Sequence, residues 1–129
     1  MNPMRRRAVT ALLALSFAAD AAWSTDGVRT PVPDARPVLL AALQSSTGTA
    51  YGVLIGETAD AITRHFQATS PIYIDVSTEK RYAQPGCSRL KVIFWQEGVR
   101  LPDVPTPRKQ MIEFGINYCL DGLPPKSLS

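Results

Sequence analysis

Few side chains of this sequence are of the types that enzymes use as acids, bases, nucleophiles or metal ligands. His65 is the only histidine, and it falls in a predicted helix, one position away from the apolar stripe of that helix. Glu57 and Asp60 form a carboxylate pair, but a helix dipole favours acidic residues in the first turn without any catalytic role. The chain has neither a G-x-S-x-G nucleophile motif nor a phosphate-binding glycine loop. These residues predict a protein that is not an enzyme and needs no cofactor.

The two cysteines, Cys87 and Cys119, could form a metal site, a reactive thiol or a disulfide. A closed zinc site is poorly supported, because the chain has one histidine and lacks C-x-x-C and H-x-x-x-H spacing. No metal is therefore expected. The choice between a thiol and a disulfide depends on the compartment, since disulfides persist outside the reducing cytoplasm.

The N-terminal sequence has the features of an export signal. Arg5, Arg6 and Arg7 precede an apolar run at residues 8–19, and Ala19-Asp20-Ala21 offers the small-x-small pattern that signal peptidase requires. The apolar run is too short for a stable membrane span. We predict a signal peptide at residues 1–21 and a periplasmic, secreted product without a membrane span; a retained anchor or an ordinary buried helix is the alternative.

Export changes the interpretation of charge and of the cysteines. Removal of three arginines and one aspartate takes the formal charge from +3 to +1. The remaining cations are interleaved with acids and lack a series of aromatic residues for base stacking, so nucleic acid is not an expected partner. In the oxidising periplasm Cys87 and Cys119 should form a disulfide, and closing a loop of roughly 33 residues should stabilise the fold by about 3 to 4 kcal/mol.

The mature chain divides into an extended tail and a single small domain. Residues 22–37, which hold three prolines, are predicted to form the tail, and residues 38–129 are predicted to form the domain. A short helix is expected at 38–45, with Leu39 and Leu43 on one side, and a second helix at 57–68. The apolar face of the second helix is predicted to cover one side of a sheet; it consists of Ile55, Ala59, Ile62 and Phe66. The pattern of the apolar stretch 51–55, between two glycines, does not show which type of secondary structure it forms.

Three later segments alternate apolar and other residues with a period of two, which predicts strands at 72–77, 90–95 and 112–117. If Cys87 lies opposite Cys119 in an antiparallel pair, the apolar residues of the last two strands also coincide: Leu90 faces Ile116, Val92 faces Phe114 and Phe94 faces Ile112. A slip by one residue would destroy this agreement. The sequence thus predicts a disulfide-clamped hairpin.

The first of these strands should pair with the second, placing Val76 opposite Leu90 and Ile74 opposite Val92. The predicted fold class is α+β, with short helices packed on a three-stranded antiparallel meander that one disulfide clamps. The odd-numbered face of this sheet would carry Tyr73, Ile93, Trp95 and Met111 beside charged residues. Such a mixture is typical of a partner-binding surface. The equally open alternative is that the first helix covers this face.

The segment 97–109 between the last two strands is a second candidate surface. Its three prolines favour a semi-extended shape that another protein could bind, and Arg100 and Arg108 are its candidate contact residues. A long hairpin loop that is simply solvated is the alternative.

Several motifs resemble those of a known group of proteins. They are Lys80-Arg81-Tyr82, Gln84-Pro85-Gly86-Cys87-Ser88-Arg89-Leu90 and the segment 114–128. These motifs are similar to those of small exported proteins encoded with conjugative plasmid transfer, that is type IV secretion, gene clusters. The resemblance covers residues 71–128 together with the signal peptide. It implies an accessory of the envelope-spanning transfer apparatus, and no catalytic residue carries over.

The expected function is therefore that of a periplasmic, non-enzymatic accessory protein of a bacterial conjugation (type IV secretion) apparatus. Its expected partners are envelope or periplasmic proteins, including secretion-system components, and protein-protein contacts would carry the function. The alternative from a different class is a small secreted inhibitor or toxin-like module that uses the proline-rich loop 97–109. A small hydrolase is a third and weaker hypothesis, because catalytic groups are scarce.

Overall fold

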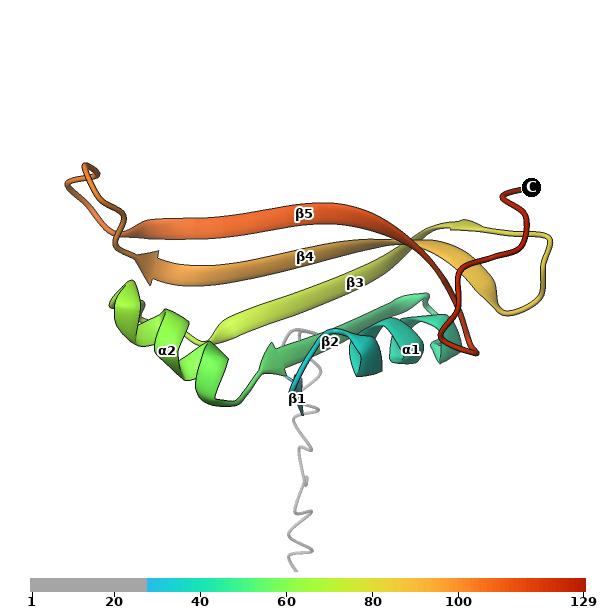
Figure 1. Ribbon diagram of the computed structural model, residues 1–129, viewed down its shortest axis with the longest axis horizontal. Coiled ribbons are helices and arrows are strands. Elements are labelled where there is room, and N and C mark those ends of the chain that lie inside the picture. Colours follow the sequence, from blue (N-terminus) through green and yellow to red (C-terminus); the bar gives the residue numbers. More distant parts are fainter. Residues whose placement is uncertain (1–27) are drawn as a thin grey trace, which may run out of the picture.

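The computed structural model describes residues 28–129, so the predicted signal peptide and residues 22–27 of the predicted tail lie outside the described residues. Two helices and five strands make up the fold (Figure 1). In chain order the elements are β1 (Thr30–Val32), α1 (Arg36–Gln44), β2 (Thr49–Leu54), α2 (Glu57–His65), β3 (Ile72–Arg81), β4 (Cys87–Val99) and β5 (Arg108–Cys119).

The five strands form one mixed sheet in the order β1-β2-β3-β4-β5. The predicted α+β class and the antiparallel β3-β4-β5 meander are confirmed, but the sheet has five strands and not three. β2 is the stretch whose type the sequence left open. β1 lies in the predicted tail: it is extended, as expected, but it pairs parallel with β2, and α1 already begins at Arg36. Pro31 fits here because β1 is an edge strand.

The register of the sheet agrees with the sequence at the disulfide and differs elsewhere. All predicted β4–β5 pairs are present, from Cys87 opposite Cys119 to Phe94 opposite Ile112. Between β3 and β4 the pairing is shifted by two residues, so that Val76 faces Val92. A bulge between Thr78 and Lys80 accompanies this shift. Side chains along a strand alternate with a period of two residues, so a shift of two residues leaves each side chain on the predicted face of the sheet.

The core lies between α1 and the even-numbered face of the sheet. Val38, Leu39 and Ala42 of α1 are buried. They pack on four strand residues that are at most 1% exposed: Ile74, Val76, Leu90 and Val92. Gly52 of β2 permits this approach, because a Cβ there would meet the Val38 side chain. The interpretation that the first helix covers the odd-numbered face is therefore wrong: as the link between two parallel neighbouring strands, α1 lies on the even face.

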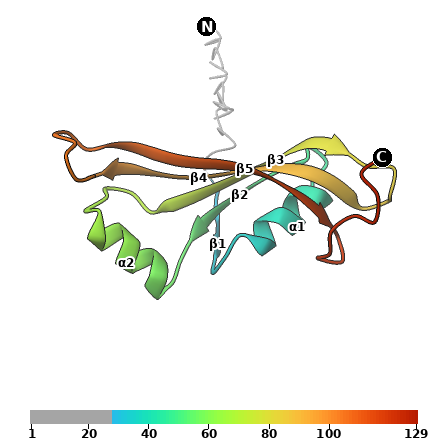
Figure 2. The same cartoon turned by 45° about the horizontal axis from the view of Figure 1, so that its top comes forward.

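α2 lies on the same side of the sheet, under its other end (Figure 2). Only Ala59 of this helix is buried, whereas Ile55 is 51% and Ile62 is 37% exposed. The helix thus lies on the predicted side of the sheet, but it covers the even face only loosely. α2 is attached at the end of the sheet, where Gln96 Nε2 donates hydrogen bonds to Thr63 Oγ1 and Ser70 O.

An open apolar groove of about 440 Å³ separates α2 from the meander. We call it the apolar groove. Its apolar lining includes Leu54, Ile62, Phe66, Ile72, Phe94 and Ile112.

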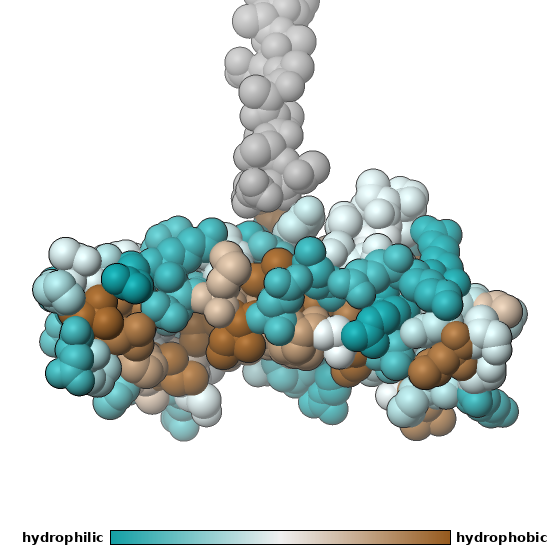
Figure 3. All heavy atoms as spheres, turned by 90° about the horizontal axis from the view of Figure 1, so that it is seen from above, coloured by the Kyte–Doolittle hydropathy of each residue, from teal (hydrophilic) through white to brown (hydrophobic). Residues whose placement is uncertain are grey.

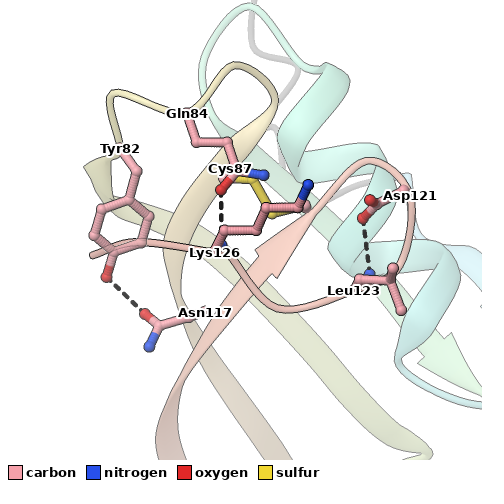
Figure 4. Close-up of a disulfide and its surroundings, with 8 residues drawn as sticks. Tyr82, Gln84, Cys87, Asn117, Asp121, Leu123 and Lys126 are labelled. Atoms are coloured by element: carbon pink, nitrogen blue, oxygen red, sulfur yellow. Dashed lines mark hydrogen bonds between the residues drawn. A yellow bond between two sulfur atoms is a disulfide. The ribbon is translucent and has the colours of Figure 1, made fainter. Parts of the chain in front are cut away.

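The disulfide Cys87–Cys119 closes the end of the meander beneath which α1 lies (Figure 4). Around it, the Tyr82 hydroxyl donates a 2.7 Å hydrogen bond to Asn117 Oδ1. The backbone N–H of Lys126 donates a 2.8 Å hydrogen bond to Gln84 Oε1. The first bond joins the turn between β3 and β4 to β5, and the second holds the C-terminal residues against this turn, so this end of the molecule is cross-linked several times.

Candidate functional site

Among residues 28–129, no helix packs on the odd-numbered face of the sheet, and this face brings the predicted partner-binding residues of the strands together. Tyr73 lies opposite Trp95, with ring centroids 4.5 Å apart, and Trp95 lies opposite Met111. Ile93 fills the next position of β4. These four residues line an open groove of about 710 Å³, which we call the aromatic groove; Arg29, Asp75 and Lys109 complete its lining.

Arg29 crosses the sheet from the segment that precedes β1. Its guanidinium Nη1 donates a 2.7 Å hydrogen bond to Asp75 Oδ1 and a 3.1 Å hydrogen bond to the Gly52 carbonyl. The guanidinium carbon lies 4.5 Å from the Tyr73 ring centroid and 5.3 Å from that of Trp95. With 11% of its side chain exposed, Arg29 is part of the groove floor and joins its charged and aromatic parts.

Trp95 is the centre of the groove. Its indole Nε1 donates a 2.8 Å hydrogen bond to Asp75 Oδ2, which fixes the ring on the sheet. Lys109 Nζ lies 4.2 Å from the centroid of the same ring. A cation over the face of an indole is a favourable contact even at an exposed site. The groove therefore offers a half-buried aromatic surface with a cation at its rim and the exposed thioether of Met111 beside it.

The groove has the chemistry of a binding surface. Each carboxylate oxygen of Asp75 already accepts a hydrogen bond, one from Arg29 and one from Trp95. Among residues 28–129, no group of three His, Cys, Asp or Glu side chains could hold a metal ion. Over the same range no helix has the length and hydropathy needed to cross a membrane. The groove offers apolar contact, aromatic faces and cations to a partner.

The two arginines predicted as partner contacts do not line the aromatic groove. Arg100 follows β4 and Arg108 begins β5, and both are exposed. Arg100 is the first residue of the loop 100–107, and Arg108 directly follows this loop, which is shorter than predicted because β4 runs on to Val99 and β5 starts at Arg108. The Arg100 N–H donates a hydrogen bond to the Phe66 carbonyl, so the base of the loop is fixed to the end of α2. His65 is exposed beside the Phe66 ring, as the sequence indicated.

Sequence reasoning missed two of the lining residues, Arg29 and Lys109. Arg29 falls in the proline-rich segment, and its partner Asp75 is 46 residues away, so no local pattern joins them. Lys109 falls in the predicted loop 97–109. A signal for it existed, because it continues the alternation of β5 as the odd-numbered neighbour of Met111.

Comparisons of the chain with protein-family models, with curated proteins and with solved structures give no match.

Proposed function

We propose that this protein is a periplasmic, non-enzymatic interaction protein of a bacterial conjugation (type IV secretion) apparatus, and that the aromatic groove is its contact surface. The observation that carries the proposal is the arrangement of Tyr73, Ile93, Trp95 and Met111 on a sheet face that neither α1 nor α2 covers. Large apolar groups gathered on an exposed face are rare in monomers and mark sites of interaction. The export signal and the C-terminal motifs supply the proposed setting.

The groove also indicates the chemistry of its partner. Aromatic residues and Met surrounded by charged side chains are typical of the central part of a protein interface. The carboxylate of Asp75 is engaged within the chain, whereas Lys109 stands exposed over Trp95. A partner segment that presents an apolar side chain next to an acidic residue would fit this combination.

The proposal is tested by co-purifying the exported protein from cells that carry or lack the transfer genes. Transfer components should be recovered with the native protein and be reduced at least about tenfold with Met111→Glu, because this substitution places a charge in the contact surface. Met111 is 54% exposed, so the fold should tolerate the change. Ile55→Glu, at a 51% exposed site outside the groove, is the matched control and should bind normally.

Recovery of no transfer component, together with undiminished plasmid transfer after deletion of the gene, would overturn the proposal.

A second function, that of a secreted inhibitor acting through its loop, is favoured by one observation. The loop between β4 and β5 projects beyond the end of the sheet, and Pro102, Pro105 and Pro107 are exposed on it (Figure 1). Cutting or shortening residues 100–107 should abolish such an activity and leave the aromatic groove functional. The Met111→Glu variant should show the opposite behaviour.

A further inference from the structure

The two edges of the sheet are protected very differently. β1 forms one edge with three residues, one of which is a proline. β5 forms the other edge with twelve residues and no proline, and among residues 28–129 no strand pairs with its outer side. A long unprotected edge is a template for another strand. Met111, Ile112 and Phe114 on this edge are 54%, 68% and 42% exposed. The space-filling view from above, the side on which β5 lies, shows brown hydrophobic patches among the polar side chains (Figure 3).

The disulfide shows which peptide groups of β5 face outwards. The Cys119 N–H donates to the Leu123 carbonyl and the Cys87 N–H to the Gln84 carbonyl, so these opposed residues form a non-hydrogen-bonded pair. Pairs of the two kinds alternate along an antiparallel ladder. The regular β4–β5 pairing from Cys87 to Gln96 therefore turns the peptide groups of the odd-numbered residues away from β4. Met111, Glu113, Gly115 and Asn117 thus present free donors and acceptors along one line.

We propose that a second copy of this chain occupies the edge, with two β5 strands pairing antiparallel about a two-fold axis at Phe114. In this arrangement Phe114 faces its own copy and Ile112 faces Ile116 of the partner. Glu113 pairs with Gly115 of the partner through outward peptide groups, as an antiparallel ladder requires. Shifting the axis to Glu113 would oppose two carboxylates, so the side chains select the register at Phe114.

Charge complementarity supports the same register. The Arg89 guanidinium lies directly over Gly115, where a side chain would collide with it, and thus reaches towards the free edge. In the proposed dimer the partner's Glu113 comes opposite Gly115 and therefore beside this guanidinium. Two-fold symmetry forms the contact twice. It would add a partner to Arg89, which within residues 28–129 forms a 3.3 Å ion pair with Glu79 and a 3.4 Å hydrogen bond to Asn117.

The oligomeric state of the purified protein tests whether two copies pair through the β5 edge. Native mass measurement or sedimentation at micromolar concentration should give twice the chain mass. Phe114→Glu should raise the dimer dissociation constant at least about 100-fold, because two charges would be buried opposite each other. Ile55→Glu, a similar change at an exposed site off the edge, should remain dimeric. A monomeric native protein overturns the proposal, and this includes the case in which the edge binds a strand of another protein.

Cross-linking tests the register without requiring a disruptive variant. A directly opposed non-hydrogen-bonded pair has a Cα separation of about 4.5 Å, which suits a disulfide. Phe114→Cys should therefore yield a covalent dimer on mild oxidation. Ile112→Cys should not, since four residues, or roughly 13 Å, would separate it from its own copy along the strands. Cross-linking through Ile112→Cys in place of Phe114→Cys would overturn the register.

Discussion

The two helices lie on the same side of one sheet and have the same length, but only one of them packs closely. α2 has the stronger sequence signature, with acidic residues in its first turn and basic residues in its last, whereas α1 has neither. Yet α1 buries Val38, Leu39 and Ala42 in the core, and α2 buries only Ala59. The helix with the clearer signature is the one that leaves a groove open.

The difference follows from the connections of the helices. α1 joins two parallel neighbouring strands, and such a crossover must return over the sheet that it connects. α2 joins the antiparallel neighbours β2 and β3, which a short turn could connect, so the chain path does not force it onto the sheet. An amphipathic pattern thus predicts a helix and its apolar face, while the chain path decides how fully that face is buried. The α1 end should dominate stability and the α2 end should contribute little.

The largest effect should come from the disulfide at the α1 end. Replacing both Cys87 and Cys119 by Ala should lower the free energy of unfolding by about 3 to 4 kcal/mol, because the unfolded chain regains the freedom of the closed loop. Chemical denaturation of the variant and the native protein measures the difference. Circular dichroism of the folded variant is the control. A loss below about 1 kcal/mol would contradict the view that this end is the stable one.

Truncating the core side of α1 should have the next largest effect. Leu39 is 4% exposed, and Leu39→Ala should cost about 3 kcal/mol through lost burial and the remaining cavity. Thermal unfolding and urea denaturation both report this change. An effect below about 1 kcal/mol would mean that α1 repacks freely, contrary to the close packing seen here.

The corresponding truncation of α2 should be mild. Ile62 is 37% exposed in the apolar groove, and Ile62→Ala should cost less than about 1 kcal/mol because much of the side chain is already in contact with water. Measured beside Leu39→Ala under the same conditions, it compares the two helices directly. Equal costs would show that the groove closes in solution and would remove the difference between them.

The smallest effect should be a pH dependence at the start of α1. Hydrogen bonds from the Arg36 side chain and backbone lower the pKa of Asp34 from 3.8 to about 2. A lowered pKa in the folded protein means that this stabilisation is present above pH 3.8 and is lost as the pH falls through about 2. The ion pair between Asp34 and Arg36 lies at the surface, where solvent screens it, so the effect should be small.

Comparing the acid unfolding of Asp34→Asn with that of the native protein measures this contribution. The stability difference between the two proteins should shrink below pH 3.8. A difference that stayed constant down to pH 2 would contradict the assignment to the Asp34 carboxylate.

The sequence predicted the features that a short-range pattern or a covalent bond determines. The β4–β5 register is correct because Cys87–Cys119 and the apolar alternation require the same pairing. The β3–β4 register is wrong by two residues because apolar alternation alone does not distinguish shifts by a full period. β1 could not be predicted, since three residues including Pro31 have no periodicity of their own.

The residues of the candidate site also divide into those that a short-range pattern places and those that it does not. Tyr73, Ile93, Trp95 and Met111 share a face because strand parity puts them there. The position of Arg29 depends instead on tertiary structure, because the pairing of β1 with β2 and of β2 with β3 is what places its segment beside Asp75. Long-range contacts of this kind leave no signal in a single sequence.

The packing of α1 on β3 and β4 also affects the order in which the chain can fold. A ribosome releases α1 well before it releases Val92, the most distant of its fully buried core partners, so the apolar side of this helix is made before the surface that covers it. Contacts between segments far apart in sequence form slowly, and exposed apolar surface promotes aggregation in the meantime. β3 and β4 together supply the surface on which α1 is buried, so a chaperone that holds residues 36–44 until β4 emerges should raise the yield of native protein.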